Sequence, residues 1–331
     1  MPHIVMSAVG VIAFFVFSLF YYLPSIVIAL LCFFVLISSI RNYGTVFFRI
    51  KLNYLRVLIC SALIAIGNSI GILVIYFTKQ SSLWPFAFVI GDVLGLVFVL
   101  FKTNILKEKP IATPLIKKTS KIYSSLMIAT LMANVLTYLD RLILLPLLGA
   151  ESVSIYTVAS FLGKSFGVIM LPLSGVLLSY YSQKSFEMNL KKYWYINLMF
   201  IAIAVFFMVM CLLLSKIVTG LFYPTLINDA SPFLLIANGA SILIIVGSMT
   251  QPAVLKYAKP IWQIVIQSIY LACYLGFGFI GSKFYGLFGF GVAAIIAALV
   301  RLIMLYFIGH FSLCRKKREA ENDLNKINEN E

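Results

Sequence analysis

Five ionisable residues lie inside long apolar runs of the sequence: Asp92, Asp140, Arg141, Lys164 and Arg301. A charge at the centre of a bilayer costs at least about 2.5–3.5 kcal/mol on insertion scales. Such groups therefore pair with one another or face a polar cavity, where they contact a substrate or an ion. These residues favour transport chemistry over the making and breaking of covalent bonds.

Polar residues accompany these charges at helical spacing. With about 100° of rotation per residue, one helix face carries Thr130, Asn134, Thr137 and Arg141. A second face carries Thr157, Ser160, Lys164, Gly167 and Ser174. Two such stripes on neighbouring helices predict a cavity wall, although small and hydroxyl-bearing residues also pack membrane helices together.

The spacing also predicts how the charges pair. Asp140 and Arg141 point about 100° apart, so they do not pair well with each other. A contact between Lys164 and Asp140 is expected, as part of the cavity or as a structural pair. Arg301 either lines the cavity or extends toward the cytoplasm. Asp92 is expected alone at membrane depth, as an ion-coupling residue or as a structural hydrogen-bond partner.

Motifs of enzyme chemistry are missing from the sequence. It contains no Walker motif, no DxD pair and no HExxH helix, and its five cysteines show no CxxC spacing. Only two histidines are present. We therefore expect no catalytic residues, no metal site and no cofactor, and we interpret the chain as a non-enzyme.

Composition sets the fold class. Of the 331 residues, 62% are hydrophobic and 11% are charged, whereas soluble domains carry about 25% charged residues. Ordinary soluble enzymes and disordered chains are excluded. Continuous rather than alternating apolar runs predict an all-α polytopic membrane protein with ten transmembrane helices rather than a β-barrel. The runs are Ile4–Phe20, Ile26–Ile40, Tyr54–Phe77, Trp84–Phe101, Ser124–Leu147, Ser152–Tyr180, Tyr195–Ser215, Pro232–Met249, Ile261–Ile280 and Leu287–Phe311.

The basic residues are distributed unevenly between these runs. Of 26 Lys and Arg residues, 20 lie in alternate loops and the C-terminal tail, and three lie in the other loops. The positive-inside rule then places both termini in the cytoplasm and the chain in the inner membrane. The net charge of +15 is interpreted as a topology signal and a contact with anionic lipids, not as nucleic-acid binding.

The same pattern divides the chain. Residues 1–103 are expected to form an N-terminal bundle of four helices, and residues 104–122 a basic cytoplasmic linker with Pro110 and Pro114. Residues 123–313 form a C-terminal six-helix bundle. Residues 314–331 are expected to be a charged, exposed and frayed cytoplasmic tail.

The segment from Asn134 to Ser182 carries a family resemblance. Its pattern has an Asn, an Asp-Arg pair, an apolar run, a Gly at the outer turn, an aliphatic-Tyr pair and a mid-helix Pro. These are Asn134, Asp140-Arg141, Gly149, Ile155-Tyr156 and Pro172. With the basic segment Phe48–Tyr54, and with Trp84 and Gly91, this resembles the O-antigen and polysaccharide flippases of the multidrug/oligosaccharidyl-lipid/polysaccharide exporter superfamily.

The resemblance implies a function. Such proteins flip undecaprenyl-pyrophosphate-linked glycans across the inner membrane, and two bundles would rock around a polar cleft. Asn134, Asp140, Arg141, Lys164 and Arg301 are then the candidate substrate-binding residues, and Asp92 is the ion-coupling candidate. A polysaccharide polymerase and glycosyltransferases are the expected partners. Family members usually have a six-helix first bundle, so we expect this chain to lack the first two helices.

Other functions stay open. A cation-coupled multidrug exporter of the same superfamily would favour acidic cavity residues, whereas three of the five intramembrane charges here are basic. A glycan polymerase or ligase commonly carries a large outer catalytic loop, and the outer segments here are too short for one. A non-enzymatic membrane partner of a glycan polymerase is a further alternative.

Overall fold

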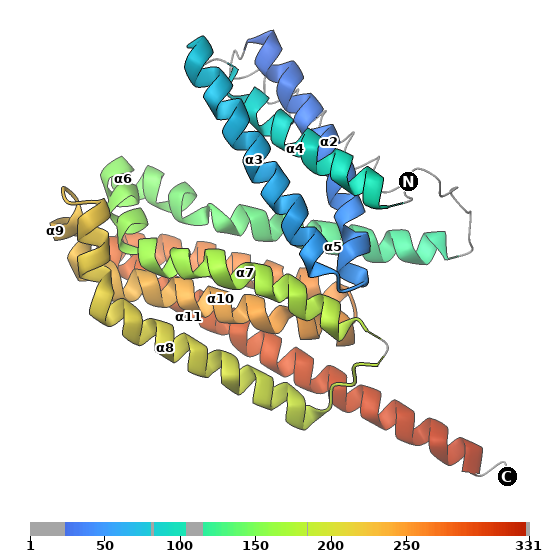
Figure 1. Cartoon of the computed structure of the whole chain (residues 1–331). Coiled ribbons are helices and arrows are strands. Elements are labelled where there is room, and N and C mark those ends of the chain that lie inside the picture. The colour runs from blue at the N-terminus through green and yellow to red at the C-terminus, as the bar shows by residue number, and fades with distance from the viewer. Residues whose placement is uncertain (1–23, 81–82, 104–114, 184, 329–331) are drawn as a thin grey trace. The chain divides into compact units, whose positions relative to one another are not determined.

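The computed structural model describes residues 24–80, 83–103, 115–183 and 185–328, which form helices and turns without a strand (Figure 1). The predicted helix Ile4–Phe20 and most of the predicted linker lie outside these residues. The chain divides into two compact units, Met1–Ser120 and Lys121–Glu331.

The first unit contains three described helices, α2 (Ser25–Ile50), α3 (Tyr54–Thr78) and α4 (Pro85–Lys102). Glycines let α3 and α4 approach closely, because a Cβ atom added to Gly67 would lie 2.6 Å from the Cα of Gly91. Small residues at helix contacts are the usual solution in membranes, where backbone proximity replaces the hydrophobic driving force.

Helix α2 is longer than predicted. It continues past Ile40 to Ile50, so Arg41 lies within the helix rather than in a cytoplasmic loop. Gly44, Thr45 and Phe48 are buried on the added turns. Phe48 packs in a cluster of buried side chains with Cys60 of α3. This packing holds the C-terminal part of α2 against the bundle, although its sequence contains polar residues.

The second unit is organised around a buried central helix. Its elements are α5 (Ile116–Thr137), α6 (Leu139–Ala159), α7 (Phe161–Tyr181), α8 (Leu190–Phe222), α9 (Ile227–Ala230), the 3-10 turn η3 (Ser231–Phe233), α10 (Leu234–Tyr257) and α11 (Ile261–Asn328). Helix α10 packs against α7, α8 and α11. Its side chains are therefore mostly buried.

Two helical segments turn at a glycine with positive φ. Gly149 in α6 has φ 83°, and Gly286 in α11 has φ 59°, a region that glycine reaches without steric cost. The two arms of α11 then pack tightly, because a Cβ added to Gly281 would lie 2.5 Å from the carbonyl oxygen of Gly289. Helix α11 therefore contains both predicted spans of this region. It also continues to Asn328, so the backbone of the tail is helical up to that residue rather than frayed.

Two predicted helices are interrupted. The segment Ser124–Leu147 is divided at Tyr138, where hydrogen bonds from Tyr138 to Val135 and from Arg141 to Tyr138 span three residues instead of four. The segment Ser152–Tyr180 is divided at Ser160, which has φ −88° and ψ 1°. Each break changes the direction in which the following side chains point.

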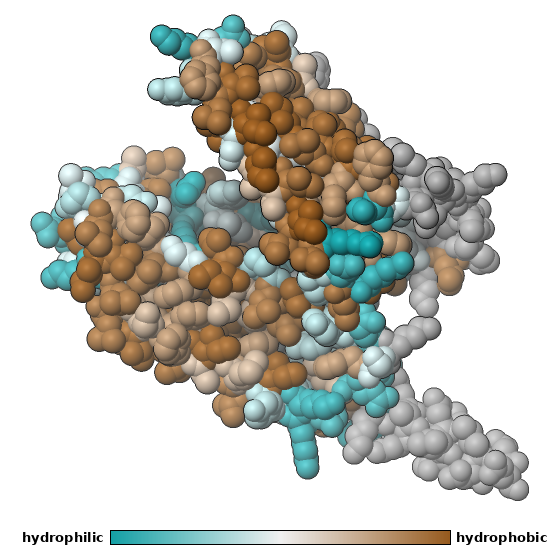
Figure 2. Space-filling model, in the orientation of Figure 1, coloured by the Kyte–Doolittle hydropathy of each residue, from teal (hydrophilic) through white to brown (hydrophobic). Residues whose placement is uncertain are grey.

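Eight helices in the described part of the chain are long and apolar enough to cross a membrane. Large apolar side chains cover their outward faces (Figure 2). Phe101 is 84% exposed, Leu221 77% and Val168 76%, which a water-soluble surface does not tolerate over such an area. The chain is thus a multi-pass helical membrane protein, and the predicted count of ten spans is not confirmed.

The contact between α7 and α10 supplies a stability prediction. Gly163 donates its N–H to the Asn238 side-chain oxygen at 2.6 Å, and an added Cβ would lie 3.0 Å from the Asn238 backbone. Gly163→Ala is therefore expected to destabilise the unit by about 1–3 kcal/mol. Gly175→Ala on the same helix meets nothing within 4 Å and is the matched control. Thermal unfolding in detergent measures both, and equal midpoints would contradict the expected close packing.

Candidate functional site

The second unit contains a polar cavity of ≈ 480 Å³. Residues of α5, α6, α7, α10 and α11 line it, together with Tyr138 at the break between α5 and α6. The polar side chains that line it are Thr137, Tyr138, Asp140, Arg141, Tyr156, Lys164, Ser241, Ser248, Gln251, Tyr270, Tyr274 and Arg301. The lining thus combines three cations with one carboxylate.

Asp140 and Lys164 form an ion pair in this cavity. The Lys164 ammonium nitrogen lies 2.8 Å from Asp140 Oδ2, as the sequence spacing predicts. Asp140 Oδ1 accepts the backbone N–H of Arg141 at 2.8 Å, and the Asp140 side chain is 9% exposed. Both oxygens of the Asp140 carboxylate thus have a partner. The negative charge of Asp140 largely neutralises the positive charge of Lys164.

Arg301 is buried on the second arm of α11 and faces the cavity. It donates from Nη2 to Gln251 Oε1 at 2.8 Å and from Nη1 to the carbonyl oxygen of Ile244 at 3.4 Å. Its guanidinium carbon lies 5.4 Å from the centre of the Tyr270 ring. Neutral groups therefore hold this cation, and it forms no ion pair with a described carboxylate. Arg301 therefore lines the cavity, which is one of the two sequence interpretations, and polar groups of α10 hold its side chain there.

Arg141 also lines the cavity, but it is exposed. Its guanidinium carbon lies 5.9 Å from the ring centre of Tyr138, and among described residues its side chain has no ion-pair partner. The side chains of Asp140 and Arg141 do not pair, as their angular separation predicts.

The predicted polar stripes line the cavity only in part. Thr137 and Arg141 of the first stripe reach it, and Lys164 and Gly167 of the second do. The stripe residues outside the lining are Thr130, Asn134, Thr157, Ser160 and Ser174. Asn134, a predicted substrate-binding residue, is exposed elsewhere on α5. On α5 the lining residues are Ala133, Leu136 and Thr137, so the cavity meets a face of this helix that does not include Asn134. The break at Ser160 separates Thr157 from Lys164, which lies on the next helix.

Several lining residues were missed by the sequence analysis. Tyr270 and Tyr274 lie four residues apart on one face of α11, and their ring centres are 5.8 Å apart. Gln251 receives the Arg301 hydrogen bond and donates its own Nε2 to Gln263 Oε1 at 3.1 Å. The sequence contains a signal for these residues, because they are amide and phenol side chains inside apolar runs, where polar groups commonly face a cavity.

Asp92 lies in the first unit and does not belong to this cavity. It is 2% exposed and forms an ion pair with Arg41 of α2. The expectation that Asp92 stands alone at membrane depth is therefore wrong. The hydropathy pattern predicts a loop at Arg41, whereas α2 continues through this residue and brings the Arg41 guanidinium to Asp92 on α4.

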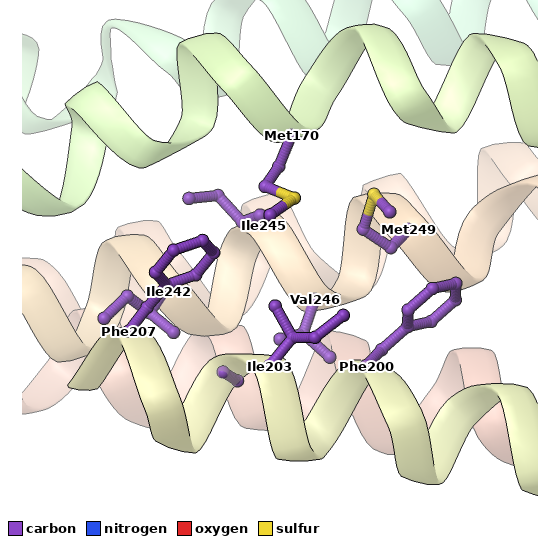
Figure 3. A pocket seen from close by; sticks show the side chains of 9 residues that line it. Met170, Phe200, Ile203, Phe207, Ile242, Ile245, Val246 and Met249 are labelled. Atoms are coloured by element: carbon purple, nitrogen blue, oxygen red, sulfur yellow. The ribbon is translucent and has the colours of Figure 1, made fainter. Parts of the chain in front are cut away.

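An apolar pocket lies between α7, α8 and α10 (Figure 3). Met170 of α7, Phe200 of α8 and Met249 of α10 are among the side chains that line it, and none of them is polar. Its volume is ≈ 20 Å³, little more than one water-sized probe. This space is a packing gap and offers no binding site for a substrate.

The described residues contain no group of three His, Cys, Asp or Glu side chains that could hold a metal ion. The fold and the cavity define the class of the protein: a multi-pass helical membrane protein whose C-terminal unit encloses a polar space with an excess of cations. No protein-family model, no curated protein and no solved structure matches the chain.

Proposed function

We propose that the chain is a transporter that flips a lipid-linked oligosaccharide or polysaccharide repeat unit across the inner membrane for cell-surface polysaccharide biosynthesis. The observation that carries this proposal is the excess of cations over acids in a cavity lined by helices that are long and apolar enough to cross a membrane. The family resemblance of the segment Asn134–Ser182 supports it independently.

The charge balance of the cavity favours an anionic substrate. Asp140 neutralises Lys164 at 2.8 Å, which leaves Arg301 and Arg141 without a carboxylate partner among the described residues. A pyrophosphate or an acidic sugar crossing hydrocarbon needs such partners. A guanidinium offers two parallel N–H donors to an oxyanion, and these bonds are about twice as strong as neutral ones.

The remaining lining suits a glycan. Tyr156, Tyr270 and Tyr274 combine an apolar ring with a hydroxyl group, while Gln251 and Ser248 add hydrogen-bonding groups. Sugars present both hydroxyls and apolar ring faces, so a mixed lining of this kind accommodates them. A cation-coupled multidrug exporter would be better served by unpaired acids, and the one acid in this lining is paired.

The proposal includes an orientation. Lys191, Lys192, Lys256 and Lys259 lie at the end of the second unit where α7 and α10 end and where α8 and α11 begin. Lys216 and Lys283 lie toward the opposite end, near the turn of α11. The positive-inside rule assigns the first end to the cytoplasm. In this proposal α11 crosses twice, once on each side of its turn at Gly286, so the eight helices make nine crossings and the predicted span Ile4–Phe20 makes ten. An even number puts both termini on the cytoplasmic side, where glycosyltransferases assemble the substrate.

A reconstituted assay tests this function. The purified protein is incorporated into liposomes that contain undecaprenyl pyrophosphate bearing a fluorophore-labelled N-acetylglucosamine. Dithionite, which does not cross the membrane, then bleaches only the outward-facing probe. A flippase exposes the entire pool of probe to bleaching, whereas liposomes without protein retain the inner-leaflet fraction.

Two comparisons make the assay decisive. A labelled phosphatidylcholine should keep its protected fraction in the same liposomes, which excludes leakage and general scrambling. An unchanged protected fraction of the pyrophosphate probe would contradict the proposal. Transport of a lipophilic cation under an ion gradient, without movement of the probe, would favour the exporter instead.

A further inference from the structure

A second cavity, of ≈ 940 Å³, is lined by residues from the end of α10, from the start of α11 and from the later part of its second arm. Four cations line it, Lys256, Lys259, Arg315 and Lys316, and no acidic side chain among the described residues does. It shares no lining residue with the cavity around Arg301. It is therefore a separate site with its own electrostatic character.

The cations of this site have different tasks. The Lys256 ammonium donates to the carbonyl oxygen of Tyr181 and to two further carbonyls after α7, and so holds the C-terminal end of that helix. The Tyr257 ring centre lies 5.3 Å from the Lys256 ammonium nitrogen and 5.2 Å from that of Lys316. Lys259 is exposed just after α10. Lys259 and Lys316 thus offer their charge to a ligand, while Lys256 is engaged within the protein.

The wall next to these cations is apolar and open. Phe307 is 59% exposed and Phe311 65%, and their rings stack with centres 6.3 Å apart. Ile261 and Trp262 line the other side of the cavity. On the second arm of α11, Phe307 and Phe311 precede Arg315 and Lys316, so these apolar side chains lie toward the span and these two cations at its end. The site therefore matches a molecule with an anionic head and hydrocarbon chains.

We propose that this cavity binds an anionic phospholipid, with its phosphate against Lys259 and Lys316 and its acyl chains along Phe307 and Phe311. A soluble phosphate would make no use of the exposed phenyl rings. A zwitterionic lipid would gain less from Lys259 and Lys316, because its own cation would be repelled by them. Basic pockets between membrane helices are the expected place for anionic headgroups, and Trp262 suits the boundary between lipid and water.

Quenching of Trp262 fluorescence tests this site. The full chain is placed in phosphatidylcholine nanodiscs that contain increasing fractions of brominated phosphatidylglycerol, and the signal of a Trp262→Phe variant is subtracted. Brominated phosphatidylglycerol should quench Trp262 at lower mole fractions than brominated phosphatidylcholine. Lys259→Gln/Lys316→Gln should weaken this preference about 30-fold, which is ~2 kcal/mol, and so erase the difference between the two lipids.

The double variant Lys191→Gln/Lys192→Gln is the matched control, because it removes the same charge at the same end of the unit but outside the cavity. It should keep the preference for phosphatidylglycerol. Equal quenching by both lipids in the unaltered chain would overturn the proposal, as would an unchanged preference in the Lys259/Lys316 variant. If that variant fails to fold, Lys259→Gln alone provides the same comparison.

A further experiment distinguishes binding of the intact lipid from binding of its soluble headgroup. Soluble glycerol phosphate, added in excess, should leave the quenching by brominated phosphatidylglycerol unchanged. Full loss of quenching would mean that the site takes a soluble phosphate, and the lipid proposal would be wrong. Because the readout is fluorescence rather than transport, its failure is distinct from a failure of the proposed flippase activity.

Discussion

Replacing Arg301 with glutamine is expected to reduce flipping of the pyrophosphate probe by about 10- to 100-fold per protein molecule. A charge-assisted hydrogen bond contributes about 1.5–3 kcal/mol, and 1.4 kcal/mol corresponds to tenfold. Glutamine removes the charge but keeps a polar side chain at this buried position, next to the cavity that Gln251 also lines, so the fold should persist. The variant is assayed in the liposomes described above, alongside its thermal unfolding.

Lys283→Gln is the matched control, since it removes an exposed cation from the same helix outside the cavity. Its flipping rate should equal that of the unaltered protein. Arg301→Lys keeps the charge but not the planar pair of donors, and an intermediate rate is expected. Normal flipping by Arg301→Gln would show that Arg301 does not contact the substrate. A loss of folded protein in that variant would instead indicate a structural role.

Removing the carboxylate of Asp92 is expected to lower the stability of the first unit by about 3–5 kcal/mol, because Arg41 would remain buried and unpaired. Asp92 is 2% exposed, and the Arg41 side chain is 16% exposed. Asp92→Ala should therefore reduce the amount of folded protein in the membrane. Arg49→Ala is the control, because Arg49 is an exposed cation on α2, the helix that carries Arg41.

The double variant Arg41→Met/Asp92→Leu separates a structural pair from an ion-coupling site. Uncharged residues of similar volume commonly replace a buried ion pair without loss of stability. If the pair is structural, the double variant should recover both abundance and flipping. Recovered abundance with flipping that no longer responds to an ion gradient would contradict this and assign coupling to Asp92. Equal stability of Asp92→Ala and Arg49→Ala would refute the buried pair.

Hydropathy alone predicts much of the helical architecture. A span needs about 20 apolar residues, and such runs are visible without knowledge of their neighbours. The spans from Tyr54 and Ile261 therefore begin within a residue of α3 and α11. The end of α2 was missed because Arg41 looks like a loop residue until its partner is known. The breaks at Tyr138 and Ser160 were missed because no proline or glycine occupies either position.

The candidate site was predictable only where its partners lie close in sequence. Asp140 and Lys164 are 24 residues apart in the sequence and lie on neighbouring helices. Helical periodicity was enough to predict their contact. Gln251 and Arg301 are 50 residues apart, and their contact depends on how α10 packs against α11. Asn134 was assigned to the cavity from its helical spacing, but the face of α5 that lines the cavity carries Ala133, Leu136 and Thr137 instead.

The sequence by itself determined that this protein is built of membrane-spanning helices and that several of them carry charges at membrane depth. It also determined which end of the second unit is basic, because charge position along the chain needs no packing information. Only the tertiary structure decided which charges are paired and which face the cavity. The physical reason is that lipid tails are as apolar as the surfaces of these helices. The hydrophobic effect therefore does not decide which face of a helix packs against another helix and which faces lipid. Backbone approach at Gly67 and Gly281, and polar contacts such as those of Arg41 and Arg301, make that selection.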